Sequence, residues 1–348
     1  MVCTLVALGA RAQVPAAPRP PLGLPTLPGA APDLALVAVG KTFFFDKRLS
    51  RDGQRSCATC HDPAHLLTDG RATAEGAARR TLTRNTPSLY NVVYVAALFW
   101  DGRVSDLVEQ ARFPLQSPLE HGLASDAELV SMVRRDPAQL AALAAALHGP
   151  AGAVTGVDVR RALAAYEQSL VAGDSAADRY LFGGEQTALS PAAVRGLELF
   201  RGRAGCANCH TMGATSALYT DGLFHPGPQA LPSTTLAKLP ELTRRVETLV
   251  AQQRLSTLSD WIDTDTDVAA LGHYLATLNP ADIGSFRTPS LRNVAQTAPY
   301  FHDGRVTTLR EAVDAELYSR ADARYPIVLT SDERRDLVEF LEALSTPY

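Results

Sequence analysis

Two short motifs constrain this chain more than any other feature: CATCH at residues 57–61 and CANCH at residues 206–210. Each motif places two cysteines three positions apart and a histidine directly behind the second cysteine. One helical turn with this spacing presents both sulfur atoms on one side and brings the imidazole next to them. Four of the five cysteines belong to the motifs, and the fifth, Cys3, lies in an apolar leader, so none remains for a structural disulfide.

Three kinds of site use closely spaced cysteines, and motif spacing and sequence context distinguish between them. Zinc ribbons place their second pair roughly 15–20 residues after the first, whereas 149 residues separate Cys57 from Cys206. A thioredoxin-like redox pair needs a βαβ context, which the sequence lacks. Covalent c-type haem fits, because two cysteines add to the vinyl groups and the next histidine becomes the proximal iron ligand. The predicted attachment residues are Cys57, Cys60, Cys206 and Cys209, and the predicted proximal ligands are His61 and His210.

An internal repeat follows each motif. Residues 85–111 and 287–313 align without a gap at an offset of 202, through segments that both contain TPSL and DGRV. Thr86 lies 29 residues after Cys57, whereas Thr288 lies 82 residues after Cys206, so the second half carries roughly fifty extra residues between motif and repeat. We therefore expect two homologous halves related by internal duplication.

The remaining patterns predict a mainly α fold made of two cytochrome c-like domains, each with one covalently attached haem. Capping boxes are expected at Ser125 and Thr330, each with a glutamate three residues later, and a helix is expected to start at Ser190 with proline at its first position. The expected segments are a signal peptide at 1–12, a proline-rich arm at 13–32, an N-terminal domain at 33–185 and a C-terminal domain at 186–348.

Composition limits the partners and the location. A net charge of −4 and a hydrophobic content of 46% are those of an ordinary globular protein and argue against a nucleic-acid partner. No apolar run reaches the roughly 18 residues that span a bilayer, so no membrane span is expected. The apolar start, which ends in Ala-Arg-Ala, favours export to the periplasm, although the usual charged leader is missing.

The sixth iron ligands decide between electron transfer and catalysis. An iron held on both sides transfers electrons, whereas an iron with an open position can bind and activate peroxide. Beyond its first residue the chain has only Met132 and Met212, and Met212 follows His210 too closely to reach the opposite haem face. His65 follows His61 by four residues, so it is expected on the same side of the haem, as a packing or surface residue. The first haem is thus predicted to be open, and the alternative is a dihaem electron-transfer cytochrome with both irons six-coordinate.

The span from about Asp33 to Tyr348 resembles the bacterial dihaem cytochrome c peroxidase and MauG superfamily. The resemblance rests on the paired CxxCH motifs and on the segments NTPSLYN, FWDGR, EQA, SPLEHG, FRTPSLRN and PYFHDGR. It implies that the N-terminal haem reacts with hydrogen peroxide and that the C-terminal haem stores or relays electrons. The implied cofactors are two covalently bound haem c groups, with a Ca²⁺ site at the domain interface.

The resemblance also assigns a distal pocket above the first haem. Carried over by position, Gln110 and Glu120 match the family's distal glutamine and glutamate, and Pro114 shields the same pocket. A carboxylate above an open iron can move a proton from the near to the far peroxide oxygen, which assists O–O cleavage. Glu120 is therefore the implied acid-base residue.

Two further positions carry over to the junction between the domains. Trp100 matches the aromatic residue that lies between the two haems, and its counterpart in the second repeat is His302. Asn85 matches a calcium ligand, which backbone carbonyls near Arg287 and Pro289 complete in the family; hard oxygen ligands suit calcium.

Departures from the family pattern bear on the substrate. Many members carry a removable distal histidine, and this chain has Ala77 at the corresponding place. Many also use methionine on the second haem, whereas MauG-like members use tyrosine, for which Tyr318 is the candidate. The alternatives for that ligand are Tyr300, Tyr325 and His302. MauG itself has an exit tryptophan where this chain has Ala204, so the MauG protein substrate does not carry over.

These features favour a MauG-like enzyme that uses hydrogen peroxide and high-valent haem iron to oxidise a tryptophan or tyrosine of a partner protein. The rival enzyme is a dihaem cytochrome c peroxidase that receives electrons from a small cytochrome c or a cupredoxin.

Overall fold

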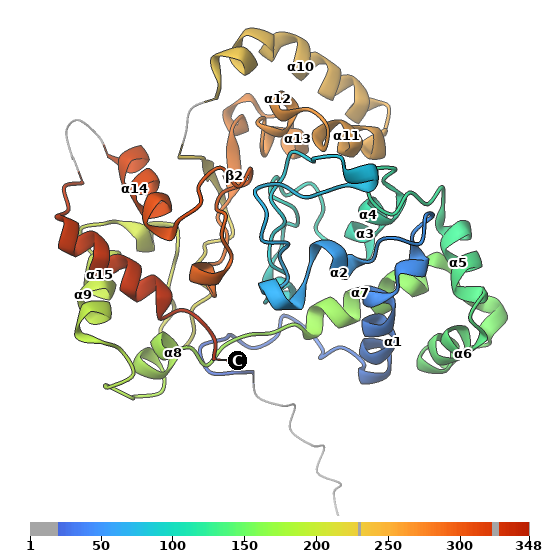
Figure 1. The fold of residues 1–348 in the computed structure, drawn as a ribbon, viewed down its shortest axis with the longest axis horizontal. Coiled ribbons are helices and arrows are strands. Elements are labelled where there is room, and N and C mark those ends of the chain that lie inside the picture. The colour runs from blue at the N-terminus through green and yellow to red at the C-terminus, as the bar shows by residue number, and fades with distance from the viewer. Residues whose placement is uncertain (1–19, 229–230, 322–326, 348) are drawn as a thin grey trace, which may run out of the picture.

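The computed structural model describes residues 20–228, 231–321 and 327–347, and within these residues the chain is mainly helical (Figure 1). The predicted mainly α fold is confirmed in this respect. The expected signal peptide and the first part of the arm lie outside the described residues. Among the described helices, none is both long enough and apolar enough to cross a membrane.

The helices of the two halves lie on opposite sides of Figure 1, with the segment between the second motif and its repeat above them. The first half contains α1 (Leu34–Phe45), α2 (Cys57–Cys60), α3 (Leu107–Gln110), α4 (Arg112–Gln116), α5 (Asp126–Arg134), α6 (Pro137–Ala146) and α7 (Gly156–Ser169). The second half contains α8 (Ala176–Leu181), α9 (Pro191–Arg201), α14 (Leu309–Arg320) and α15 (Ser331–Glu342). Ser125, Ser190 and Thr330 each accept a backbone hydrogen bond at the start of α5, α9 and α15. The predicted capping box is complete at Thr330, whereas at Ser125 the Glu128 carboxylate accepts from the N–H of Ala124 instead.

A close crossing of α1 and α7 forms the centre of the first half. A Cβ atom on Gly40 would lie 1.8 Å from the carbonyl oxygen of Ala162, so only glycine allows the two helices to approach this closely. Four residues further along each helix, the rings of Phe44 and Tyr166 pack edge to face at 5.0 Å. The helix that precedes the first motif is thus fixed against the last helix of its half.

The same crossing recurs between α9 and α15. A Cβ atom on Gly196 would lie 1.9 Å from the carbonyl oxygen of Asp336, and four residues later Phe200 and Phe340 pack edge to face at 5.2 Å. In both halves, therefore, a glycine and an aromatic residue four positions apart hold the helix that leads into a CxxCH motif.

The extra residues of the second half form a small helical unit with its own core. It comprises α10 (Ser233–Ala251), α11 (Leu255–Ile262), α12 (Thr266–Ala269) and α13 (Tyr274–Thr277), and it is flanked by β1 (Phe224–Pro226) and β2 (Ser285–Arg287), which pair antiparallel. Three hydrogen bonds attach α11 to the first half: Arg103 to Ser259 (3.1 Å), Ser117 to Asp260 (3.2 Å) and Thr83 to the carbonyl of Ile262 (2.5 Å). An insertion in the second half therefore covers part of the first.

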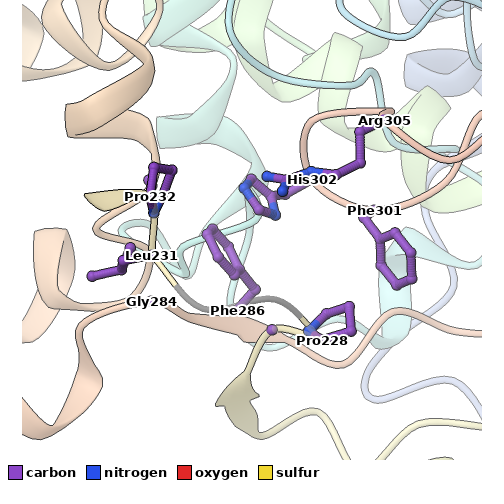
Figure 2. A pocket seen from close by; sticks show the side chains of 10 residues that line it. Pro228, Leu231, Pro232, Gly284, Phe286, Phe301, His302 and Arg305 are labelled. Atoms are coloured by element: carbon purple, nitrogen blue, oxygen red, sulfur yellow. The ribbon is translucent and has the colours of Figure 1, made fainter. Parts of the chain in front are cut away.

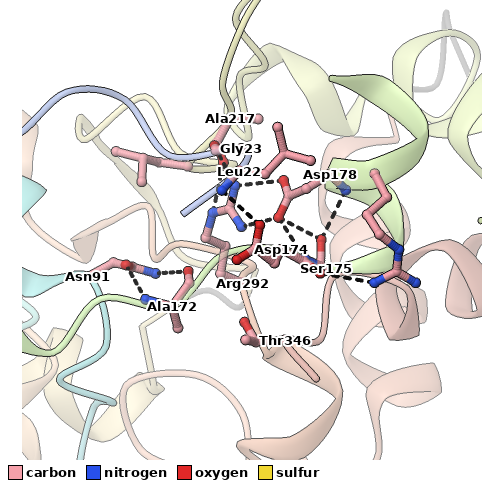
Figure 3. A network of polar contacts seen from close by, with 12 residues as sticks. Leu22, Gly23, Asn91, Ala172, Asp174, Ser175, Asp178, Ala217, Arg292 and Thr346 are labelled. Atoms are coloured by element: carbon pink, nitrogen blue, oxygen red, sulfur yellow. Dashed lines mark hydrogen bonds and ion pairs between the residues drawn. The ribbon is translucent and has the colours of Figure 1, made fainter. Parts of the chain in front are cut away.

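The described part of the proline-rich arm, residues 20–32, packs into the junction between the halves (Figure 3). Arg292 makes two bonds of 2.8 and 2.9 Å to Asp178 and donates to the carbonyl oxygens of Gly23 (2.6 Å) and Ala217 (2.9 Å). The side chains of Arg292 and Asp178 are 1% and 0% exposed. The arm is thus anchored by a buried ion pair, which the composition of the arm alone does not reveal.

Replacing Arg292 by methionine should destabilise the protein by about 3–5 kcal/mol, because the buried Asp178 carboxylate loses its charge partner. Urea unfolding of the haem-loaded protein measures the change. The matched control is Arg335→Met, which removes an arginine from an exposed pair with Asp332 and should cost at most about 1 kcal/mol. Equal stability of the two variants would contradict the anchoring role of the ion pair.

Candidate functional site

The first motif forms one helical turn that begins at Ser56 and ends at its histidine. The backbone N–H of His61 donates to the carbonyl of Cys57 at 2.9 Å, which closes the turn. The imidazole Nδ1 lies 2.9 Å from the carbonyl oxygen of Leu67, so Nδ1 is the protonated nitrogen and Nε2 remains available to a metal. The predicted turn is confirmed.

The second motif has the same two contacts. The N–H of His210 donates to the carbonyl of Cys206 at 2.9 Å, and its Nδ1 lies 2.9 Å from the carbonyl oxygen of Tyr219. Burial lowers the pKa of both motif histidines, and this favours the neutral imidazole that binds iron. Both histidines are therefore held in the same tautomer, with Nε2 unprotonated.

Two serines that the sequence reasoning did not single out support these histidines. Ser88 donates to the carbonyl of Leu66 at 2.7 Å, and Ser290 donates to the carbonyl of Leu218 at 2.7 Å. Each carbonyl belongs to the residue just before the one that holds the motif histidine. The signal was present, because both serines belong to the TPSL element of the repeat. The repeat thus positions the loop behind each proximal ligand.

A pocket beside the first motif brings together the residues that the resemblance assigned to it. The space between its lining residues, including the part that is open to solvent, amounts to about 670 Å³. Its lining includes Cys57, Cys60, His61, Gln110, Pro114 and Glu120. Residues from α2, α3, α4 and the following loop therefore meet at one cavity, while the catalytic roles assigned to them remain predictions.

The electrostatics of this pocket depend on the inserted helical unit. Burial raises the pKa of Glu120 to about 8, and the nearby acids Asp263 and Asp260 on α11 raise it further, while Arg103 opposes the shift. Burial also raises the pKa of Asp263 to about 6. The sequence offered no signal for this arrangement, since α11 comes from the other half of the chain.

Two more titratable side chains that line the pocket were missed. Glu167 on α7 has a buried Oε2 with no hydrogen-bond partner among the described residues, and burial raises its pKa to about 8. His121 follows Glu120, and its Nδ1 lies 2.9 Å from the carbonyl oxygen of Leu49. The available signals were an acid within an alanine-rich stretch of the sequence and a histidine next to Glu120. His65, as expected, is exposed.

Trp100 connects the two copies of the repeat. Its indole Nε1 donates to the carbonyl of Asn85 at 2.9 Å, and its own carbonyl accepts from the N–H of Arg287 at 3.1 Å. The amide nitrogen of Asn85 donates to the carbonyls of Arg71 and Ala72 at 2.9 and 3.3 Å. Calcium would need the amide oxygen instead, so the calcium role of Asn85 stays a prediction.

The structure gives no support to Tyr318 as the second haem's sixth ligand. Its side chain is 85% exposed on α14, whereas the preceding Leu317 is buried in the core that contacts Cys206. Among the alternatives, Tyr300 is buried and Tyr325 lies outside the described residues. Figure 2 shows His302 in another pocket, where its ring stacks on Phe286 at 3.7 Å. The identity of this ligand therefore stays open.

The motif residues fit covalent haem better than zinc. Among the described residues, one group of histidine, cysteine and acidic side chains brings its ligand atoms within 4.8 Å, namely Cys209, Asp221 and His225, and it does not unite the two motifs. Burial raises the pKa of Cys60 to about 12 and that of Cys206 to about 11. Thioether attachment of haem uses reduced cysteines next to an imidazole ligand, and all four motif cysteines are free.

Comparisons with known proteins agree with this chemistry. A family model described as di-haem cytochrome c peroxidase matches residues 34–186. The cytochrome-c peroxidase IdrP1 of Denitromonas iodatirespirans is 36% identical over 99% of this chain and 90% of its own length. The methylamine utilization protein MauG of Methylorubrum extorquens is 33% identical over 88% of this chain and 77% of its own length.

Solved structures extend the similarity to three dimensions. A MauG-like protein associated with microbial copper homeostasis superposes with a TM-score of 0.73 at 28% identity, covering 96% of both chains. The diheme peroxidase BthA from Burkholderia thailandensis gives a TM-score of 0.67 at 27% identity, covering 90% of this chain and 87% of its own. The chain is therefore a haem peroxidase-type oxidoreductase, and it belongs to the di-haem cytochrome c peroxidase family that includes MauG.

Proposed function

We propose that the protein is a periplasmic, hydrogen peroxide-dependent dihaem enzyme of the MauG-like kind, which oxidises a tryptophan or tyrosine side chain of a partner protein. The observation that carries the proposal is the pocket that joins the first CxxCH motif to Gln110, Pro114 and Glu120. The matching contacts of the two motif histidines support a haem in each half.

In this proposal Cys57, Cys60 and His61 would hold a haem that supplies the redox chemistry, and the chain's own residues manage protons and position. One H₂O₂ becomes two waters by taking up two electrons and two protons, and the partner side chain supplies the electrons. A carboxylate oxygen of Glu120 takes the proton from one peroxide oxygen and returns it to the other. Gln110 and Pro114, on the same wall, restrict the position of peroxide and of water.

The absence of two family ligands favours the MauG-like reaction. The N–H of Ala77 donates to the carbonyl of Leu119 at 2.5 Å, so the loop of Ala77 lies beside Glu120. Many family members carry a removable histidine at this position of the loop, whereas this chain has only the methyl group of alanine. The enzyme should therefore need no reductive ligand switch. The lack of a methionine for the second haem points the same way.

The second candidate is a peroxidase that receives electrons from a small cytochrome c or a cupredoxin. The relatives named cytochrome-c peroxidase and the similarity to BthA support it. The non-enzymatic electron carrier is not favoured, because the relatives are peroxidases.

Spectroscopy of the resting ferric protein tests the proposal. We expect an electron paramagnetic resonance signal from one high-spin haem, because the first iron has an open position. Peroxide added without a donor should then give a long-lived oxidised species that involves both haems. Rapid turnover with a reduced small cytochrome, and no such species, would favour the second candidate. Two low-spin haems that ignore peroxide would contradict both.

Replacing Trp100 by phenylalanine should uncouple the two haems, because it removes the indole of a residue whose backbone carbonyl accepts from Arg287 of the second repeat copy. We expect peroxide to react at the first haem as before, but the shared oxidised species should decay on the order of tenfold faster. Stopped-flow absorption measures the decay. The matched control is Trp261→Phe, which changes the chain's other tryptophan, on α11, where it lies under Arg245. Equal decay in the two variants would exclude a relay role for Trp100.

A further inference from the structure

Each copy of the repeat has one largely buried arginine just before its TPSL element, with part of each residue still exposed. At the offset of 202, Arg84 aligns with Phe286 and Arg287 aligns with Asn85, so the two arginines occupy neighbouring rather than equivalent positions. Both lie at the junction between the halves, since the N–H of Arg287 donates to the carbonyl of Trp100 and the guanidinium of Arg84 lies 5.2 Å from the centre of the Phe286 ring.

Arg84 has acidic neighbours but no hydrogen-bonded counter-charge within the described residues. Its Nε, Nη1 and Nη2 are buried and form no hydrogen bond. Its ion pair with Asp101 is long, at 3.6 Å, and Arg103 already binds that carboxylate at 2.7 and 2.9 Å. Asp263 and Asp303 also favour the charged form of Arg84, but they form no hydrogen bond with it. Burial together with the Arg84 charge lowers the pKa of His302 to about 3.

Arg287 has even less compensation. Its Nε is buried and forms no hydrogen bond with the described residues. Burial lowers its pKa to about 10, and no acidic neighbour among the described residues offsets this. A buried charge without a partner costs several kcal/mol, and a guanidinium group matches a carboxylate through two parallel hydrogen bonds. Both arginines therefore have the chemistry of an incomplete carboxylate-binding site.

The position of the arginines indicates which carboxylates complete it. Arg287 directly precedes Thr288, whose carbonyl accepts from Thr220 at 2.6 Å, and Thr220 follows the tyrosine that holds His210. Arg84 directly precedes Asn85, whose carbonyl holds the Trp100 indole. Each arginine is thus one residue away from a contact of a predicted haem site, and each haem c carries two propionate groups.

We propose that Arg84 and Arg287 bind propionate carboxylates of the two haems and so neutralise them at the junction between the halves. The proposal rests on the two haems and not on the identity of the protein substrate. A guanidinium next to a propionate stabilises the more electron-rich ferrous haem, so loss of the arginine lowers the reduction potential.

The experiment uses the haem-loaded full chain with Arg287→Met and Arg84→Met, and Arg310→Met as the control that removes an exposed arginine. Spectroelectrochemical titration gives the midpoint potential of each haem, and resonance Raman gives the propionate bending band. We expect each buried-site variant to lower the midpoint potential of one haem and to shift its propionate band. The control should leave both readouts unchanged.

Several outcomes would overturn the proposal. Potentials and propionate bands of both variants equal to those of Arg310→Met would do so. A wild-type potential that follows the concentration of added chloride or acetate would assign the site to a free anion instead. If Arg287→Met yields no haem-loaded protein, Arg287→Lys is tested instead, because lysine keeps the positive charge but cannot form two parallel hydrogen bonds with a carboxylate. A shifted propionate band in Arg287→Lys supports the proposal, and an unshifted band overturns it. None of these measurements uses peroxide or a partner, so failure of the proposed function would not affect them.

Discussion

Replacing Cys57 and Cys60 together by alanine should remove the covalent haem from the first pocket and abolish the reaction with peroxide. In the proposed site, thioether bonds to both sulfurs would hold the haem, and His61 alone would leave it free to dissociate. The haem content should fall from two groups per chain to one, as measured by the pyridine haemochrome assay after denaturation. The remaining haem should be the one attached at Cys206 and Cys209.

The reciprocal variant, with Cys206 and Cys209 replaced by alanine, separates the two sites. It should also retain one haem, but that haem should still show the high-spin ferric signal and still react with peroxide. The two half-loaded proteins should therefore differ in spin state although they contain the same amount of haem. If peroxide reacts only with the protein that keeps the C-terminal haem, the assignment of the reactive site is reversed.

The chemistry of the site was predictable because the residues that carry it lie in short, contiguous segments of the sequence. The spacing of Cys57, Cys60 and His61 fixes one helical turn, and the structure forms that turn with the imidazole oriented by a backbone carbonyl. Gln110 and Glu120 lie close together in sequence, so a local match to the family placed them in one pocket. The repeat also marked the two TPSL segments, whose serines support the loops behind both motif histidines.

Contacts between distant segments were not predictable from these patterns. Asp263 reaches the surroundings of Glu120 only because α11 folds onto the first half, and no periodicity in the insertion indicates that packing. The arm looked like a linker because proline prevents regular structure, yet the carbonyl of Gly23 completes the hydrogen bonding of Arg292. The sequence position made Tyr318 a candidate ligand but did not indicate which way its side chain points, and on α14 the side chain is exposed to solvent.

Replacing Glu120 by glutamine should slow the reaction with peroxide by about 10²–10⁴-fold, because glutamine has the same shape but cannot take up a proton. The carboxyl pKa is raised to about 8 by burial and by neighbouring acids, so the wild-type rate should rise with pH up to about 8 and then level off. The variant should lose this dependence. Stopped-flow mixing of the ferric protein with peroxide across pH 5–10 measures both effects.

Glu167→Gln is the matched control for Glu120→Gln, because Glu167 is a second buried glutamate in the same pocket and its pKa is also raised to about 8. Both glutamates have a pKa of about 8 in the folded state and an ordinary pKa of 4.5. Between these two pH values the folded state binds more protons than the unfolded state, so the stability of the protein falls as pH rises from 4.5 to about 8. Each variant should therefore be at least as stable as wild type above pH 8, and a slow reaction cannot be blamed on unfolding. A large rate loss in Glu167→Gln with none in Glu120→Gln would transfer the proton-handling role to α7. Losses of equal size would mean that the pocket needs both carboxyl groups, and that the position matched by the family is not sufficient to move the proton.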